Sequence, residues 1–248
     1  MASHEEMSRS FGSAAAAYEA GRPEYPAAAV EWMLEPVRSG GRPRVADVGA
    51  GTGKLTRALV ATGAEVVAIE PDAVMLERLR EASPGVPTAI GTGESLPLPD
   101  AELDAVVFGQ AWHWVDEPAA SAEAGRVLRS GGVLGLVWNI RDESVEWVAE
   151  MSRIMHGSNA EMMLAQGGPQ VAAPFDTLES RSWAWPRAMT RAQLSDMVAS
   201  RSYVITADTD ERARIDRELV ALFDRIGAVD DAVIDLPYVT TAFRARRP

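Results

Sequence analysis

The sequence contains no cysteine and a single lysine, Lys54, among its 248 residues. Without cysteine the chain can form no disulfide and offers no thiolate to a metal, and it fits a reducing compartment. Histidine is also scarce, and His4 and His156 stand isolated, so we expect no metal site. Because nearly all positive charge is arginine, a lysine-rich phosphate patch is excluded.

Long apolar runs are missing as well. No window approaches the roughly 18 apolar residues of a membrane span, and the polar stretch Met1–Ser13 lacks the layout of a secretory signal. We therefore expect a cytoplasmic protein with no membrane partner. The net charge of −12 disfavours non-specific binding to nucleic acid, so no nucleic-acid partner is expected either.

The stretch from Arg44 to Thr56 organises the first half of the sequence. An apolar run with β-branched residues ends abruptly at three glycines, Gly49, Gly51 and Gly53, and an amphipathic helical pattern follows at once. A strand, a glycine turn and a helix in that order bring backbone N–H groups close to the polar atoms of a ligand. This turn is the predicted centre of a binding site.

Around the turn, short apolar strands alternate with helices. The pattern predicts strands at 45–48, 65–70, 88–90, 105–108 and 133–138, and helices at 27–37, 54–61, 73–82 and 117–128. Such alternation indicates a parallel sheet covered on both faces, with the ligand along the edge where the strands end. After Trp138 we expect helices at 144–155, 159–165, 191–200 and 211–226, an extended piece at 181–185, and a last strand at 236–246.

The spacing of the glycines discriminates between ligands. A dinucleotide fingerprint needs its third glycine one place later, where this chain has Lys54, and the spacing of a phosphate-binding P-loop is also absent. The turn, preceded by Asp47, therefore suits a ligand without a pyrophosphate. Glu70 closes the second strand, where a carboxylate can accept both hydroxyls of a ribose. The alternative is a solvated acid that caps the helix beginning after Pro71 and Asp72.

Several motifs in order carry a family resemblance that covers Phe11 to Asn139. They are the turn Asp47-Val-Gly-Ala-Gly-Thr-Gly53, the acidic strand end Glu70, the loop from Gly91 to Asp100, the segment from Leu103 to Trp114, and Arg126-Val-Leu-Arg-Ser-Gly-Gly132. With them the sequence resembles the class I S-adenosylmethionine (SAM)-dependent methyltransferases. The N-terminal Phe11, Tyr18 and Arg22-Pro-x-Tyr-Pro26 are similar to a small-molecule subgroup that includes trans-aconitate methyltransferase-like proteins.

The resemblance implies a fold and a division of the chain. The fold is α/β, with a Rossmann-like, seven-stranded, mostly parallel sheet, helices on both faces, an antiparallel last strand and a helical cap inserted after strand five. Residues 1–40 would form a helical arm over the cofactor and residues 41–139 the SAM-binding core. Residues 140–235 would form the substrate-binding cap with part of the sheet, and 236–248 the C-terminal strand. We expect a monomer or a homodimer.

The resemblance also assigns residues to the cofactor. Asp47 and the turn would hold the methionine end of SAM, Glu70 the ribose and the Gly91–Glu94 loop the adenine, while the backbone carbonyl of Gln110 would hold the ammonium. Relatives often have Asp where this chain has Thr92, so adenine recognition falls to a hydroxyl, to the Gly93 amide or to Glu94. The full set of expected cofactor contacts is Tyr18, Arg22, Asp47, Gly49, Ala50, Gly51, Gly53, Glu70, Pro71, Thr92, Gly93, Glu94, Gln110, Ala111 and Trp112.

Residues expected to meet the methyl acceptor are aromatic or amide side chains near the strand ends. They are Tyr25, Trp114, Trp138, Asn139 and Tyr203. His113 is the candidate general base, because an imidazole can take a proton from a hydroxyl or an amine. Each assignment has a structural alternative: a core tryptophan for Trp112 or Trp114, a backbone-bonded histidine for His113, and simple packing for the N-terminal arm.

The predicted function is methyl transfer from SAM to an oxygen or nitrogen of a small organic molecule, with S-adenosylhomocysteine as the product. The reaction depends on holding the nucleophile, the methyl group and the sulfur in line, so a catalytic base is optional. A SAM-binding regulator that does not methylate is one alternative. A nicotinamide-dependent oxidoreductase is a second, which Lys54 at the third-glycine position disfavours.

Overall fold

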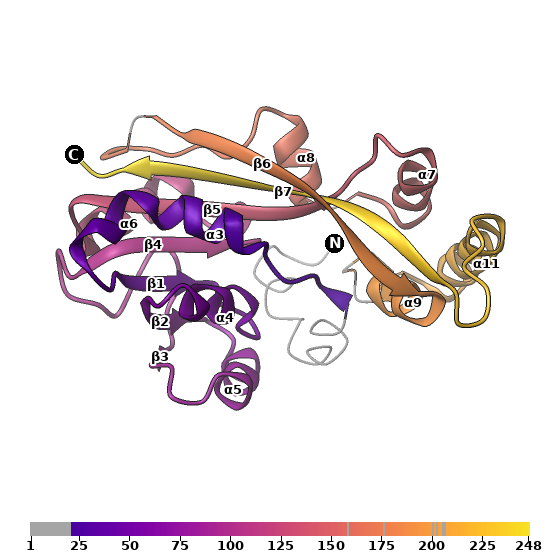
Figure 1. The fold of residues 1–248 in the computed structure, drawn as a ribbon, viewed down its shortest axis with the longest axis horizontal. Coiled ribbons are helices and arrows are strands. Elements are labelled where there is room, and N and C mark those ends of the chain that lie inside the picture. Colours follow the sequence, from indigo (N-terminus) through magenta and orange to yellow (C-terminus); the bar gives the residue numbers. More distant parts are fainter. Residues whose placement is uncertain (1–20, 158, 176, 200, 202, 205–206) are drawn as a thin grey trace.

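The computed structural model describes residues 21–248 except 158, 176, 200, 202, 205 and 206, and its centre is a seven-stranded sheet (Figure 1). The strands lie in the order β3-β2-β1-β4-β5-β7-β6. Their bounds are β1 (Arg44–Val48), β2 (Glu65–Ile69), β3 (Thr88–Ala89), β4 (Leu103–Gly109), β5 (Leu128–Arg141), β6 (Glu179–Thr190) and β7 (Val233–Arg246).

The sheet is parallel except at its last strand. β1 pairs in parallel with both β2 and β4, and β3 and β5 extend the parallel part on either side. β7 runs antiparallel to both of its neighbours, β5 and β6. The predicted fold class, with seven mostly parallel strands and a reversed last strand, is confirmed.

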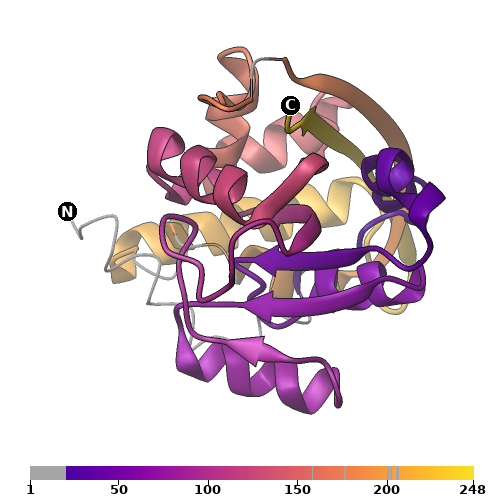
Figure 2. The ribbon, with the colours of Figure 1, turned by 90° about the vertical axis from the view of Figure 1, so that its left-hand side faces the viewer.

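Helices cover both faces of the sheet (Figure 2). On one face, side chains of α3 (Ala27–Leu34) and α4 (Lys54–Ala61) pack with Val45, Val107 and Val137 of the central strands. On the other face, α6 (Glu117–Val127) and α8 (Asn159–Ala165) pack with the alternate strand residues, among them Val106 and Phe108. Successive strand residues point to opposite faces, so nearly continuous apolar strands are needed to fill both layers.

Helix starts follow the capping residues read from the sequence. The Asp72 carboxylate accepts hydrogen bonds from the Val74 and Met75 amides and begins α5 (Ala73–Ala82). The Asp116 side chain accepts from the Ala119 amide in the same way at the start of α6. The predicted helix at 27–37 is shorter: α3 ends at Leu34 and the 3-10 helix η2 (Glu35–Gly40) follows, because Pro36 has no N–H to continue the α-helical ladder.

β5 is much longer than the predicted strand at 133–138. It begins at Leu128, and the glycines at 131 and 132 lie within it rather than ending the preceding helix pattern. Gly131 donates to the Arg247 carbonyl, and the Arg247 amide donates to the Gly132 carbonyl, so the chain end pairs with this segment. Pairing with β4 on one side and β7 on the other holds β5 extended over 14 residues.

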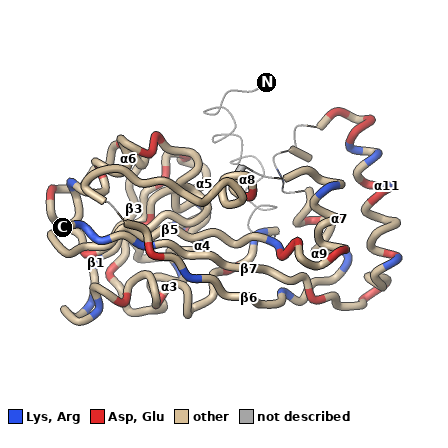
Figure 3. Tube along the Cα trace, turned by 90° about the horizontal axis from the view of Figure 1, so that it is seen from above, with Lys and Arg blue, Asp and Glu red and all other residues tan. Residues whose placement is uncertain are grey.

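The second half builds a cap with its own apolar core. α7 (Glu146–Met155), α9 (Arg191–Ala199) and α11 (Thr209–Arg225) gather at the end of the long β6–β7 pair (Figure 1). Their buried side chains include Met151, Leu194 and Leu222, which pack with Tyr238 of β7 in one apolar cluster. Acidic and basic residues alternate along the outer surface of α11 (Figure 3), as expected of a solvated helix face.

Within the described residues, none of the helices has the length and apolar character that crossing a membrane would need. Acidic residues and histidines of the same part of the chain also form no cluster of three or more that could hold a metal ion.

Arg126 of α6 ties the loop after β3 to the fold. Its guanidinium donates to the Leu96 and Leu98 carbonyls at 3.1 and 2.9 Å, and it also binds the carboxylates of Asp100 and Glu123. Glu123 in turn accepts from the Leu96 amide at 2.7 Å. Arg126 and Glu123 together thereby hold the segment from Leu96 to Asp100 against α6.

We predict that Arg126→Lys lowers the free energy of unfolding by about 1–2 kcal/mol, because an ammonium cannot satisfy two carbonyls and two carboxylates at once. The control is Arg78→Lys, since Arg78 makes an exposed ion pair with Glu81 and should change stability by less than about 0.5 kcal/mol. Urea unfolding followed by circular dichroism measures both. Equal stability of the two variants would contradict the assigned role of Arg126.

Candidate cofactor and acceptor site

The glycine turn joins β1 to α4 through three left-handed residues. Gly49, Gly51 and Gly53 have φ angles of 68°, 55° and 88°. A Cβ on Gly49 would lie 2.7 Å from the Cβ of Ala111, whereas one on Gly51 would meet nothing within 4 Å. Glycine is therefore required at 49 for close packing as well as for backbone conformation, and the backbone at 51 borders open space.

Asp47 lies at the base of this turn and is almost fully buried. Its Oδ2 accepts a hydrogen bond from the Thr56 hydroxyl at 2.5 Å, while its Oδ1 has no partner. Burial raises the pKa of this carboxyl from 3.8 to about 7; the Thr56 hydrogen bond opposes the rise and the nearby Glu70 charge adds to it. A buried acceptor without a donor indicates that a ligand supplies one.

Glu70 follows β2 and bridges the turn to the start of α5. Its Oε2 accepts from the Gly51 amide at 2.8 Å and its Oε1 accepts from the Asp72 amide at 3.0 Å. Burial raises the pKa of this carboxyl too. A carboxylate offers about four lone-pair positions, so each oxygen can still accept a further hydroxyl. The capping and ligand-binding interpretations of Glu70 are thus compatible.

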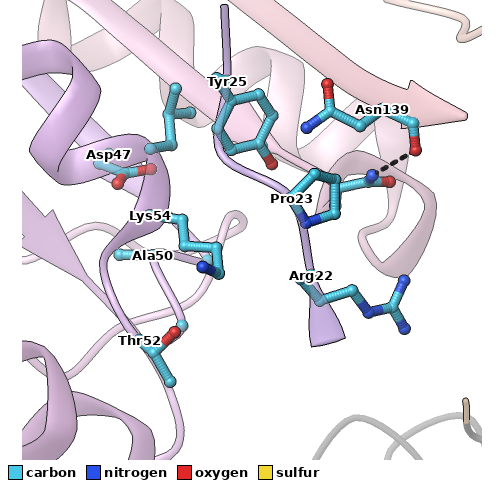
Figure 4. A pocket seen from close by; sticks show the side chains of 13 residues that line it. Arg22, Pro23, Tyr25, Asp47, Ala50, Thr52, Lys54 and Asn139 are labelled. Carbon is cyan, nitrogen blue, oxygen red and sulfur yellow. Dashed lines mark hydrogen bonds between the residues drawn. The ribbon is translucent and has the colours of Figure 1, made fainter. Parts of the chain in front are cut away.

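A pocket of about 450 Å³, partly open to solvent, lies over the turn (Figure 4). Figure 4 shows the glycine turn with Asp47 and Ala50 on one side and the segment from Arg22 to Tyr25 on the other. Its lining residues are Arg22, Pro23, Tyr25, Asp47, Gly49, Ala50, Gly51, Thr52, Lys54, Leu55, Gly109, Gln110 and Asn139. Eight of the predicted cofactor or acceptor residues are brought together here: Arg22, Tyr25, Asp47, Gly49, Ala50, Gly51, Gln110 and Asn139.

The ends of β4 and β5 form the far wall of the pocket. Gln110 has a positive φ of 56°, and its side-chain amide donates to the Asn139 carbonyl at 2.8 Å. The Asn139 side chain donates to the Glu24 carbonyl at 3.2 Å and accepts from the Thr240 hydroxyl at 2.6 Å. Asn139 therefore holds the N-terminal segment against the sheet edge.

The N-terminal segment also contacts the helix after the turn. The Lys54 ammonium lies 2.9 Å from the carboxylate of Glu24, and the Arg57 guanidinium lies 3.2 Å from the same oxygen. A Cβ on Gly109 would lie 2.8 Å from the Tyr25 hydroxyl, so Tyr25 packs directly on the end of β4. Tyr18, assigned to the cofactor from the sequence, lies outside the described residues.

The loop after β3 lies beside this pocket, next to the ends of β2 and β4. Gly93 fits against Phe108 and Val115, where a Cβ would come within 2.8 Å of the Val115 side chain. The Glu94 carboxylate accepts from the Asp116 amide at 2.8 Å, and Thr92 is exposed. Pro71 is exposed as well, and Gly53 and Ala111 support the turn without lining the space above it.

Two of the expected aromatic contacts belong to the core instead. Trp112 is fully buried, stands edge-on to Phe108 with ring centroids 4.8 Å apart, and donates its indole N–H to the Gln170 carbonyl. Trp138 is also fully buried and packs edge-on to Phe243. Buried indoles with a satisfied N–H are ordinary core residues. The sequence alone could not distinguish this core role of Trp112 from a contact with the cofactor.

His113 is half-buried between two tryptophans. Its ring lies 4.9 Å from that of Trp114, and its Nδ1 accepts a hydrogen bond from the Trp138 indole at 3.3 Å. The neutral ring then carries its proton on Nε2, so Nδ1 is its basic nitrogen. His113 is thereby anchored to β5, and the nitrogen able to accept a proton is the one beneath the Trp138 indole.

Tyr203, expected from the sequence to contact the acceptor, does not line this pocket. Its hydroxyl donates to Glu211 of α11 at 3.1 Å and its ring packs on His156 at 4.2 Å, on the surface of the cap. The pocket residues that sequence reasoning missed are Pro23, Thr52, Lys54, Leu55 and Gly109. Four of them are next to an assigned residue in the chain, and Leu55 is two positions after Gly53, so nearness in the sequence was the available signal.

The residues around the pocket fit SAM. The unpartnered Asp47 oxygen suits an ammonium, the Glu70 carboxylate suits a ribose diol, and the open backbone at Gly51 allows close approach of a ligand without a pyrophosphate. In SAM the methionine ammonium, the ribose and the adenine follow one another, matching the order of turn, β2 end and β3 loop along the sheet edge.

Comparison with known proteins also indicates a methyltransferase. A methyltransferase domain family model matches residues 46–136. An uncharacterized methyltransferase of Mycobacterium tuberculosis is 44% identical over 244 residues, which cover 98% of each chain. A solved structure of a proposed type II methyltransferase from Anaeromyxobacter dehalogenans superposes with a TM-score of 0.68 at 24% identity, covering 91% of this chain and 97% of the other.

A phosphoethanolamine N-methyltransferase of Haemonchus contortus, solved with S-adenosylhomocysteine, shares the fold with a TM-score of 0.51 at 15% identity, covering 100% of this chain and 61% of the other. None of these similarities tests membership of the trans-aconitate methyltransferase-like subgroup, which stays a prediction. With the glycine turn, the acidic strand end and these relatives together, the chain belongs to the class I SAM-dependent methyltransferases, and its cofactor is S-adenosylmethionine.

Proposed function

We propose that the enzyme transfers the methyl group of SAM to an oxygen or nitrogen of a small organic molecule. The observation that carries this proposal is the pocket between the glycine turn and residues 22–25, with the unpartnered Asp47 oxygen at its base. The net charge of −12 further argues against a nucleic-acid substrate.

Asp47 and the turn hold the methionine end of the cofactor in this proposal. The Asp47 Oδ1 accepts from the ammonium, and the carbonyl of Gln110, a residue that lines the pocket, is a second acceptor. Glu70 keeps its two backbone hydrogen bonds and accepts the ribose hydroxyls with its remaining lone pairs. The Gly93 amide and Glu94 border the adenine.

The acceptor meets the methyl group at the ends of β4 and β5. Tyr25 and Asn139 line the pocket there, and Trp114 lies next to His113 in the segment that follows β4. SAM supplies an activated methyl group, and the protein supplies alignment and exclusion of water. The segment from Arg22 to Tyr25 contributes the exclusion of water, since it covers the pocket and is fixed by Asn139 and Lys54.

His113 is the side chain that we propose as general base. It would take the acceptor proton at Nδ1, which requires the Trp138 indole to release that nitrogen. General-base catalysis contributes roughly 10²-fold or more in rate. In this proposal the remaining rate acceleration comes from holding the acceptor, the methyl group and the sulfur in line.

Cofactor binding is the first test, and we predict that calorimetry detects SAM and S-adenosylhomocysteine but not NAD. Asp47→Asn should weaken SAM binding by roughly 10- to 100-fold, because a charged hydrogen bond is lost while the Thr56 hydroxyl can still donate to the amide oxygen. The matched control is Asp104→Asn, which makes the same change in a residue of β4 whose carboxylate binds Arg44. Binding of NAD without SAM would overturn the proposal.

The same titration carries a pH prediction. The pKa of Asp47 is raised to about 7, so the free protein binds a proton there below neutral pH. A ligand ammonium favours the ionised carboxylate, so SAM affinity should increase roughly fivefold between pH 6 and pH 7. Asp47→Asn should lose most of this dependence. An equal pH dependence in the variant would assign the effect to another group.

The role of His113 is tested by His113→Asn, whose side-chain oxygen can still accept from the Trp138 indole but cannot take up a proton. An acceptor is first identified by mass spectrometry as a gain of one methyl group among small acids, phenols and amines. We predict a fall in methyl-transfer rate of roughly 100-fold with unchanged SAM affinity. His156→Asn, in the cap, is the control. Full activity of His113→Asn across pH 6 to 9 would exclude a base at this position.

A further inference from the structure

A buried arginine at the end of β5 has an unused donor group. Arg141 is 2% exposed, and its Nη2 donates to the Glu161 carboxylate at 2.6 Å and to the Ser152 hydroxyl at 3.1 Å. Its Nε also points to the Ser152 hydroxyl, at 3.4 Å. Its Nη1 is buried and has no hydrogen-bond partner. The ion pair with Glu161 therefore accounts for one edge of the guanidinium and leaves the Nη1 donors unsatisfied.

Tyr238, the residue directly opposite Arg141 on the neighbouring strand, also has a buried polar group without a hydrogen-bond partner. Tyr238 on β7 is the cross-strand partner of Arg141, is 1% exposed, and has a buried hydroxyl without a partner. Its ring is stacked on Trp185 of β6, with centroids 5.2 Å apart at an interplanar angle of 18°. Directly opposed residues of an antiparallel pair project to the same face. Two unsatisfied polar groups thus project to the same face of one cross-strand pair.

Packing alone does not explain this pair. A phenylalanine at 238 would keep the stacking on Trp185, and a lysine at 141 could keep the ion pair with Glu161. Leaving a buried donor unsatisfied costs about 1–3 kcal/mol, and native cores rarely contain such groups without a reason. The Arg141 Nη1 group can only donate hydrogen bonds and the Tyr238 hydroxyl can donate one as well, so a single acceptor group satisfies both.

The pair lies next to the cofactor pocket. Asn139, which lines that pocket, precedes Arg141 by two residues on the same strand and so shares its face, at a spacing of about 7 Å. Asn139 is itself opposite Thr240, whose hydroxyl also accepts from the Trp185 indole at 2.7 Å. A row of polar side chains on β5 and β7 therefore leads from the pocket residue Asn139 to Arg141 and Tyr238.

We propose that Arg141 Nη1 and the Tyr238 hydroxyl bind an oxyanion of the methyl acceptor, a carboxylate or a phosphate, and so select an anionic substrate. This subsite rests on the proposed methyl transfer, because it places the acceptor beside the cofactor. A guanidinium edge together with a phenol matches the two acceptor oxygens of such a group. Glu161 and Ser152 hold the other edge of the guanidinium and orient it.

The test measures binding to the complex with S-adenosylhomocysteine by calorimetry. The probes are benzoate, succinate and phenyl phosphate, each compared with its neutral counterpart, namely benzamide, succinamide and phenol. At least one anion should bind saturably and at least tenfold more tightly than its neutral partner. Tyr238→Phe should weaken that anion about tenfold and Arg141→Lys by more, with S-adenosylhomocysteine affinity changed by less than twofold.

Tyr203→Phe is the matched control, since that hydroxyl lies in the cap and should not alter anion binding. If Arg141→Lys does not fold, Tyr238→Phe alone decides, because it removes one oxygen and keeps the stacked ring. Failure of any anion to bind to a protein that binds S-adenosylhomocysteine, equal binding of neutral partners, or an unchanged Tyr238→Phe would overturn the subsite. Failure of S-adenosylhomocysteine itself to bind would instead overturn the proposed function.

Discussion

The carbonyl of Ile69 accepts hydrogen bonds from the Gly49 and Ala50 amides at 2.9 and 3.1 Å, and this junction fixes the glycine turn against the end of β2. From it follow the short distance between Gly51 and Glu70, the burial of Asp47 and the open backbone above it. β1 and β2 are parallel neighbours, and parallel strands end at one edge of the sheet, so their pairing brings Asp47 and Glu70 together. The position of the site is therefore set by main-chain hydrogen bonds between the glycine turn and the end of β2.

That dependence explains what the sequence could predict. Helices at 54–61, 73–82 and 159–165 agree with the structure to the residue, because local caps and apolar periodicity specify them. The glycine turn, Asp47 and Glu70 were also predictable, since Asp47 lies near the end of β1 and the other two directly follow a strand. Trp112 and Trp138 were harder, because a tryptophan near a strand end can face either the core or the site, and only tertiary packing decides between them.

The pairing of Arg141 with Tyr238 could not be read from the sequence for a different reason. Arg141 and Tyr238 are 97 residues apart, and their relation is created by the antiparallel register of β5 and β7. Register across such a distance depends on how two whole strands align, not on a local motif. Tyr203, in the half expected to choose the acceptor, contacts Glu211 of α11 and His156 at the surface of the cap and does not line the pocket.

Lys54, which forms an ion pair with Glu24, makes the pocket accessible to selective chemical labelling. Lys54 is the single lysine of the chain, and its ammonium lies at the wall of the cofactor pocket, paired with the segment that covers it. A reagent that acylates amines would, apart from the chain's α-amino group, modify this one position. Because the ion pair with Glu24 shields this amine, the extent of labelling at Lys54 would measure how accessible the pocket wall is to solvent.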